Sequence, residues 1–250
     1  MSGHSKWSTI KHKKAKTDEK RGKEYTKLAK EIILAARSGG GDPDSNSKLK
    51  LAVQNAKAVN MPNENIARAI KKGTGEVESD MIEEIIYEGY APGGVAVMLD
   101  IATDNRNRTA SDIRHLFSKN NGNLGENGCV AYMFDRVGLI EIKRENIKVD
   151  VEEFMLQAIE AGADDVKEDD DIVEIITSPD NFMAVKEAME KEVALEEAGI
   201  VMLAGTSVEI NDEAMAAKVL KLIDALEDHD DVQNVYANFS IPDEILEKLM

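Results

Sequence analysis

The chain has one cysteine, Cys129, among its 250 residues. A single thiol excludes an internal disulfide framework, and the absence of any Cys-x-x-Cys pair excludes the usual zinc-binding spacing. No apolar run approaches the roughly 18 residues that a membrane-spanning helix needs. The first residues, MSGHSKW, contain no hydrophobic stretch typical of a signal peptide. These absences predict a cytoplasmic protein that is neither secreted nor embedded in a membrane.

Signatures of catalysis are missing too. The sequence contains no GxSxG, HExxH or GxGxxG motif, and its four histidines are scattered without metal-ligand spacing. Cys129 begins an apolar pattern that predicts a strand over residues 129–134 and a buried, inert thiol. We therefore expect a protein that is not an enzyme and that uses no cofactor, metal or small-molecule substrate.

Positive charge is scarce in most of the chain. Lys and Arg number 31 against 48 Asp and Glu, a net charge of −17, which excludes a uniformly basic nucleic-acid coat. The distribution is uneven, because residues 1–73 carry 17 basic and 7 acidic side chains whereas residues 74–250 carry 14 and 41. This asymmetry predicts a basic module directed at nucleic acid and carried on an acidic body.

The first 75 residues are expected to form a basic arm followed by a helical bundle. Apolar residues at i, i+3, i+4, i+7, i+8 and i+11 predict a helix over residues 18–38, which three glycines, 39–41, then stop. A second helix is expected from about Ser47, and Pro62 opens a third that runs to Gly73.

The remaining sequence predicts two αβ domains. Strands over 81–87 and 95–101 form a hairpin whose second strand is continuously apolar and therefore buried, and a helix over 110–119 is expected to be capped by Thr109. Residues 137–204 have the order βαββαβ, which is the ferredoxin-like arrangement. A strand over 206–210, a helix over 212–227 and a strand over 232–240 complete the interrupted first half.

The predicted fold class is α+β with three domains, an N-terminal three-helix bundle and two αβ (ferredoxin-like) domains, the third inserted in the second. The expected boundaries are 1–75 for the basic arm and bundle, 76–135 with 205–250 for the discontinuous middle domain, and 136–204 for the inserted domain.

Basic residues of the arm and first helix are the candidates for nucleic-acid binding, because lysines on phosphates release counterions and give salt-sensitive affinity. Trp7 lies among them and either stacks on a base or packs onto the bundle. The predicted contact residues here are Lys6, Trp7, Lys11, Lys13, Lys14, Lys16, Lys20, Arg21 and Lys23.

Arg106 and Arg108 stand just before the expected helix at 110–119, where the helix dipole disfavours cations. Either a bound anion, which would add a second phosphate contact, or carboxylates of the acidic body would offset this cost. A second open alternative concerns the glycine-rich segment 121–128, which forms either an anion-binding nest of backbone amides or a plain turn.

Several motifs together resemble one known family. They are GHSKW at residues 3–7, GGGDP at 39–43, YEGYAPGG at 87–94, DNRNRT at 104–109 and GNLG at 122–125. The chain resembles the YebC/PmpR family, whose eukaryotic members include the mitochondrial translational activator of cytochrome oxidase subunit one.

This resemblance implies a three-domain protein without a catalytic residue or cofactor, and it implies two functions. Family members are described as probable transcriptional regulators that bind DNA, and also as ribosome-associated factors that ease translation through stall-prone, proline-rich stretches. The partner expected from the resemblance is therefore DNA, or ribosomal RNA and the ribosome. No stretch reads as a helix-turn-helix recognition helix with base-reading Arg and Asn, which leaves the two functions open.

Overall fold

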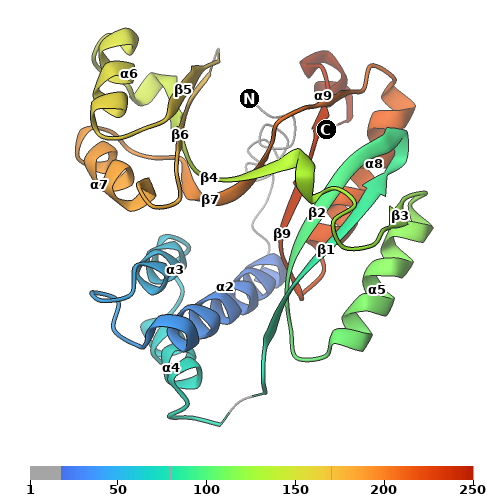
Figure 1. Cartoon of the computed structure of the whole chain (residues 1–250), viewed down its shortest axis with the longest axis horizontal. Coiled ribbons are helices and arrows are strands. Elements are labelled where there is room, and N and C mark those ends of the chain that lie inside the picture. The colour runs from blue at the N-terminus through green and yellow to red at the C-terminus, as the bar shows by residue number, and fades with distance from the viewer. Residues whose placement is uncertain (1–17, 79, 170, 250) are drawn as a thin grey trace.

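The chain folds into one helical and two αβ domains (Figure 1). This computed structural model describes residues 18–78, 80–169 and 171–249. The second αβ domain is inserted in the first, because its whole sheet lies between strands that belong to the other sheet. The predicted α+β class with an inserted third domain is confirmed.

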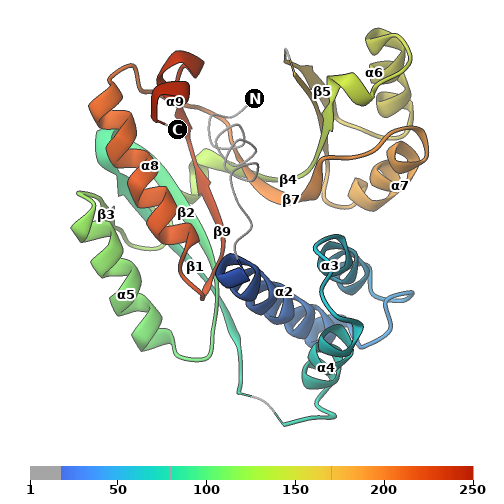
Figure 2. The ribbon, with the colours of Figure 1, turned by 180° about the vertical axis from the view of Figure 1, so that it is seen from behind.

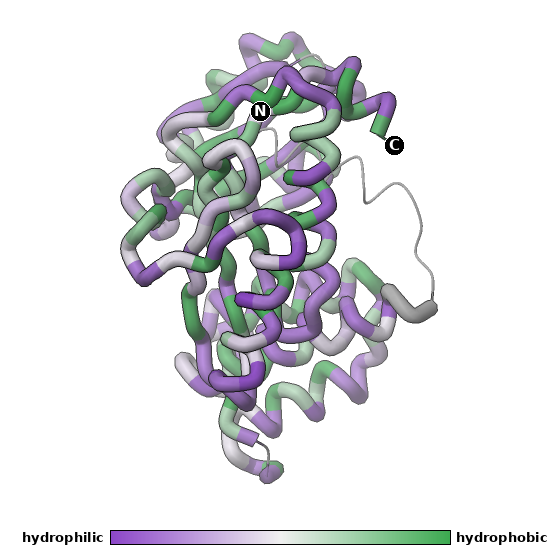
Figure 3. The backbone as a smooth tube through the Cα atoms, turned by 90° about the vertical axis from the view of Figure 1, so that its right-hand side faces the viewer, coloured by the Kyte–Doolittle hydropathy of each residue, from purple (hydrophilic) through white to green (hydrophobic). Residues whose placement is uncertain are grey.

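The N-terminal domain consists of α2 (Asp18–Gly39), α3 (Ser47–Ala58) and α4 (Asn63–Thr74), which lie close to the predicted positions. Asn46 caps α3, since its side-chain oxygen accepts from the backbone N–H of Leu49 at 3.1 Å. The apolar face of each helix packs inward, with Ile32, Leu49 and Ile66 buried. In Figure 3, hydrophobic and hydrophilic residues alternate along these helices, as one buried face requires.

The middle domain has a four-stranded sheet in the order β3-β1-β2-β9. Helices α5 and α8 cover one face of this sheet (Figures 1 and 2). The turn between β1 and β2 contains Gly93 and Gly94 at φ of 80° and 78°, a backbone region that side chains larger than glycine rarely adopt. The elements are β1 (Glu83–Ala91), β2 (Val95–Thr103), α5 (Arg106–Lys119), β3 (Asn123–Leu124), α8 (Glu213–Glu227) and β9 (Val232–Ala237).

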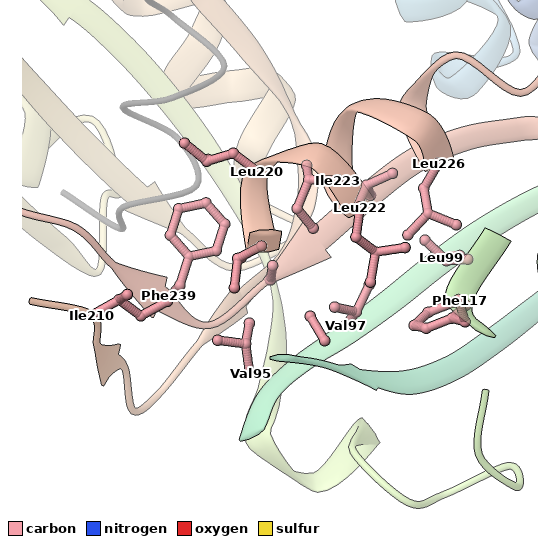
Figure 4. Packing of buried hydrophobic residues seen from close by; sticks show 14 of the residues in the cluster. Val95, Val97, Leu99, Phe117, Ile210, Leu220, Leu222, Ile223, Leu226 and Phe239 are labelled. Carbon is pink, nitrogen blue, oxygen red and sulfur yellow. The ribbon is translucent and has the colours of Figure 1, made fainter. Parts of the chain in front are cut away.

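Strand β2 is buried on both faces, as its continuous apolar run predicted. One face presents Val97 and Leu99 to Leu222 of α8 and Phe117 of α5 (Figure 4). The other face places Met98 in a second cluster that joins the two αβ domains. Burial of each large apolar side chain contributes roughly 1.5–3 kcal/mol, so the strand holds both layers together.

The inserted domain has the predicted βαββαβ order and a sheet arranged β5-β6-β4-β7. Its core lies between the sheet and its two helices and includes Ile140, Phe154, Val173 and Phe182. The elements are β4 (Phe134–Lys143), α6 (Val151–Glu160), β5 (Asp165–Glu168), β6 (Ile172–Thr177), α7 (Phe182–Glu192) and β7 (Glu197–Ala204).

The expected strand over 129–134 is wrong. Residues Ala131–Met133 form a 3-10 turn, and β4 begins only at Phe134. The reason is that the backbone N–H groups of Val130 and Ala131 donate to the Glu88 carboxylate, each at 2.8 Å, instead of joining a strand ladder.

The end of the chain differs from the expected long strand over 232–240. After β9, a short strand β10 (Phe239–Ser240) pairs in parallel with β8 (Val208–Glu209). A helix that the sequence patterns did not predict, α9 (Asp243–Leu249), follows and buries Leu246. Within the described part of the chain, no helix has both the length and the apolar character needed to cross a membrane.

A fragment of residues 134–204 is expected to fold on its own, because its sheet borrows no strand from the rest of the chain. Its amide NMR spectrum should be well dispersed. The fragment exposes Phe134, Val201 and Met202, which pack against the middle domain in the full chain, so the measurement needs dilute protein. A collapsed spectrum would contradict the autonomy of this domain.

Candidate nucleic-acid interface

Three lysines of α2 lie on one helical face, because Lys23, Lys27 and Lys30 are spaced i, i+4 and i+7. The Nζ atom of Lys23 donates to the carbonyl oxygen of Asp228 at 3.2 Å, and Lys27 donates to that of Glu227 at 2.6 Å. We call these three residues the α2 lysine row. The row binds the C-terminal end of α8, in a different domain.

The end of α8 attracts these cations for two reasons. The last carbonyls of a helix lack intrahelical partners, and the helix dipole places partial negative charge there. The last turn of α8 contains no basic residue of its own. The five residues that end the helix and lead into β9, Glu227 to Asp231, are also acidic apart from His229. We call this segment the acidic turn.

Asp231 is the most connected residue of the acidic turn, with only 6% of its side chain exposed. One carboxylate oxygen accepts from Lys30 Nζ at 2.7 Å, and the other accepts from Arg108 Nη2 at 2.9 Å and from Thr109 Oγ1 at 2.8 Å. Burial alone would raise the pKa of Asp231, but these bonds outweigh it and hold the pKa well below its usual range. Asp231 is therefore ionised at neutral pH.

Helix α5 begins at Arg106, four residues earlier than expected. Asn105 is its cap, since the Asn105 side chain accepts from the backbone N–H of Arg108 at 3.1 Å. The expected cap, Thr109, is instead the fourth residue of α5, where it is buried and donates to Asp231. The sequence pattern missed this start because Asn105 and Thr109 are both good capping residues and only the long-range contact to Asp231 selects between them.

The two arginines of this segment, Arg106 and Arg108, have different surroundings. The guanidinium of Arg108 forms ion pairs with Asp104 at 2.8 Å and with Asp231 at 2.9 Å. Of the two alternatives left open by the sequence, body carboxylates therefore neutralise Arg108. The Arg106 side chain is exposed and lines an open groove of about 530 Å³ whose other residues include Glu83, Glu84 and Ile86.

The last residue of the glycine-rich segment, Gly128, forms an anion-binding nest together with Val130 and Ala131 beyond it, and the chain fills this nest with its own carboxylate. The backbone N–H groups of Gly128, Val130 and Ala131 donate to Glu88 at 2.6, 2.8 and 2.8 Å. Burial raises the pKa of Glu88, but these three bonds outweigh it and lower the pKa below its usual value. The nest therefore stabilises the fold and is occupied by Glu88.

Cys129 lies in this nest loop and is half-buried, where a fully buried strand position was expected. Burial raises the pKa of its thiol, which stays protonated at neutral pH and is a poor nucleophile. Among the residues that the structure describes, no group of three or more His, Cys, Asp or Glu side chains is placed to hold a metal ion.

Most of the predicted arm contacts lie outside the described residues, namely Lys6, Trp7, Lys11, Lys13, Lys14 and Lys16. Both interpretations of Trp7 therefore stay predictions. Lys20 belongs to α2 by its backbone, and its side chain is outside the described part as well. Arg21 is exposed on α2, and Lys23 is the first member of the α2 lysine row.

The basic residues of the first helix that the sequence offered for phosphate binding include Lys27 and Lys30, but the sequence reasoning missed Asp231, the partner of Lys30. Two signals in the sequence mark them. One is the helical spacing of the lysines, and the other is the run of four acids in five residues at 227–231. Neither signal shows by itself that the two segments meet, because about 200 residues separate them.

Comparison with known proteins places this architecture in a family. Residues 5–76 match the model described as "TACO1/YebC protein N-terminal domain", and residues 82–239 match "TACO1/YebC second and third domain". The chain belongs to the TACO1/YebC family. The resemblance predicted from the sequence motifs is thus confirmed over nearly the whole length.

Relatives in the TACO1/YebC family align with nearly the whole length of the chain. A "Probable transcriptional regulatory protein" of Syntrophomonas wolfei is 69% identical over all of both chains, and one of Natranaerobius thermophilus is 59% identical over 99% of both. The crystal structure of a conserved hypothetical protein, Aq1575, from Aquifex aeolicus has a TM-score of 0.85 at 54% identity and covers 95% of this chain and 97% of that one.

Replacing Asp231 with Asn is expected to lower the free energy of unfolding at pH 7 by about 3 kcal/mol, because the largely buried Lys30 ammonium, 16% exposed, loses its counter-charge. Urea denaturation between pH 8 and pH 3 measures the difference from the unchanged protein. The folded-state pKa of Asp231 lies below the unfolded one, so its contribution is complete above the unfolded value and is lost as pH falls toward the folded value.

The difference in free energy of unfolding between the unchanged protein and Asp231→Asn should therefore stay constant down to about pH 5. Below about pH 4 it should narrow by roughly 1.4 kcal/mol for each pH unit. Asp230→Asn is the control, since Asp230 contacts Lys30 through its backbone carbonyl, which the change retains. A gap that does not change with pH would contradict an ionised Asp231.

Arg106 and Arg108 should differ in how much each contributes to the free energy of unfolding. Arg108→Gln is expected to lower the free energy of unfolding by about 1 kcal/mol, the usual upper range for half-exposed ion pairs. Arg106→Gln should leave it unchanged, because the exposed Arg106 side chain makes neither of the ion pairs that Arg108 makes. Chemical denaturation of both variants in the same buffer compares them, and equal losses would show that both arginines hold the fold.

Proposed function

We propose that this member of the TACO1/YebC family is a non-enzymatic regulator of gene expression that binds DNA through its basic N-terminal region. The observation that carries the proposal is the segregation of charge, with a net +10 over residues 1–73 and −27 over the rest. A polyanion is attracted to the first segment and repelled by the second, so the field of the protein itself orients the complex.

Several features of the described residues support a binding role without catalysis. The Cys129 thiol is held protonated by burial, and the nest of backbone amides that could bind an oxyanion is occupied by Glu88. Two relatives are named "Probable transcriptional regulatory protein", and a role in transcription favours DNA as the partner. Lysines on phosphates position a protein without reading bases, so we expect weak sequence preference.

A second candidate function is that of a ribosome-associated translation factor that eases stalling on proline-rich stretches. The acidic body favours it, because a surface of net charge −27 resists lying along a duplex but attracts basic ribosomal proteins. In this case the basic region would contact ribosomal RNA in place of DNA.

Crosslinking in cells followed by sequencing of the attached nucleic acid separates the two functions. Recovery of promoter DNA supports transcriptional regulation, and recovery of ribosomal RNA supports the translation factor. Recovery of neither would contradict both functions and direct attention to an enzymatic role.

Changing Lys11, Lys13, Lys14 and Lys16 together to Ala is expected to flatten the dependence of log affinity on log salt concentration. The slope should change by about 0.9 for each lost phosphate contact on duplex DNA and by about 0.7 on a single strand. Fluorescence anisotropy with labelled duplex DNA and single-stranded RNA, from 50 to 300 mM salt, measures both slopes.

The matched control changes four exposed lysines of the αβ domains, Lys148, Lys191, Lys218 and Lys221, to Ala. This variant has the same net charge as the arm variant, so any difference between their slopes comes from position. An unchanged slope in the arm variant, with its circular dichroism spectrum intact, would remove the arm from the binding site.

A further inference from the structure

The acidic turn collects cations from two other parts of the fold. Four of its five residues are acidic, and its atoms accept from all three members of the α2 lysine row and from Arg108 of α5. Lys23 and Arg108 are also among the residues predicted to contact nucleic acid. The same cations that suit a phosphate backbone are therefore held by a segment of the chain itself.

These cations are not held equally. Lys30 Nζ has three N–H donors and three acceptors, the carbonyls of Ala102 at 3.0 Å and Asp230 at 2.9 Å and the Asp231 carboxylate at 2.7 Å, and only 16% of its side chain is exposed. Lys30 is a saturated anchor between α2 and the middle domain.

Lys23 and Arg108 are held more loosely than Lys30. Lys23 is half-buried and donates to the Asp228 carbonyl at 3.2 Å, near the long end for such bonds. The Arg108 side chain is 49% exposed and therefore meets solvent. A phosphate group could replace the acceptors of both residues while the Lys30–Asp231 contact keeps α2 attached to the middle domain.

Two carboxylates of the acidic turn have no part in these contacts. Asp228 and Asp230 accept from the lysines through their backbone carbonyls, and both residues are exposed. Their negative charges thus stand beside the α2 lysine row without being needed to hold it. They repel any phosphate that approaches these lysines.

We propose that the acidic turn is an internal competitor of nucleic acid, which holds Lys23 and Arg108 in the free protein and is displaced from them by a phosphate backbone. This inference rests on the proposed function and adds a regulation of the same site. The acidic turn raises the number of phosphates that a ligand must offer in order to bind. A short or weakly charged polyanion is therefore rejected, and a long nucleic acid, which offers many phosphates, is accepted.

Removing the two exposed charges tests whether the acidic turn opposes the binding of phosphates to these cations. The double variant Asp228→Asn with Asp230→Asn keeps both backbone carbonyls and hence the lysine contacts. With the full chain, it should bind labelled duplex DNA and single-stranded RNA about three- to tenfold more tightly than the unchanged protein at 50 mM salt, and the gain should shrink at 300 mM as screening increases.

The control is the double variant Glu160→Gln with Glu192→Gln. These two exposed acids lie in the last turns of α6 and α7 in the inserted domain, and their removal changes the net charge by the same amount. A gain in affinity confined to the Asp228 and Asp230 variant supports the competitor. Unchanged or weaker binding by that variant, or an equal gain in the control, overturns it while the proposed function stands.

Failure of the proposed function gives a different result. If the unchanged protein binds neither probe at 50 mM salt, both the nucleic-acid function and the inference built on it are overturned. Asp228→Asn alone provides a second variant should the double change disturb folding, and its circular dichroism spectrum and urea midpoint are compared with those of the unchanged protein first.

Discussion

A buried carboxylate, that of Asp231, fixes how the helical domain meets the middle domain. An ionised side chain with 6% exposure must be paired, because an uncompensated buried charge costs several kcal/mol. Its partners come from α2 through Lys30 and from α5 through Arg108 and Thr109. Lys30 also reaches the carbonyl of Ala102 at the end of β2. One charge thus sets the position of the basic helix, the start of α5 and the end of the central sheet relative to one another.

The same solution recurs at the glycine-rich loop, where Glu88 fills a nest of backbone amides. In both places a positively polarised site that could attract an external anion is satisfied by a carboxylate of the chain. The acidic composition therefore does more than keep the protein dispersed in solution. It places carboxylates on a guanidinium and on backbone amides that an external anion would otherwise contact.

The inserted domain is attached to the middle domain by an apolar contact of its own. Phe134 at the start of β4 and Met202 near the end of β7 pack with Met98 and Tyr236 on the face of the central sheet that lacks helices. The hydroxyl of Tyr236 donates to Asp100 at 3.0 Å, and burial together with that carboxylate raises the pKa of Tyr236 far above its usual value. The two αβ domains are therefore joined mainly through an apolar packed surface, whereas α2 is joined to the middle domain by its lysines.

The amino-acid sequence by itself determined the features that depend on neighbours along the chain. Apolar spacing placed α2, α3 and α4, the continuous apolar run identified β2 as doubly buried, and the βαββαβ order of the inserted domain followed from periodicity and turns. Five sequence motifs were enough to recognise the family.

Tertiary structure decided what depends on distant partners. Residues 129–134 became a turn because Glu88, more than forty positions earlier along the chain, takes their amides, and α5 began at Arg106 because Thr109 was needed by Asp231, which lies 122 positions further on. Local patterns carry no information about which distant carboxylate arrives, and a buried charge outweighs the small local preferences that separate a strand from a turn or one helix cap from another.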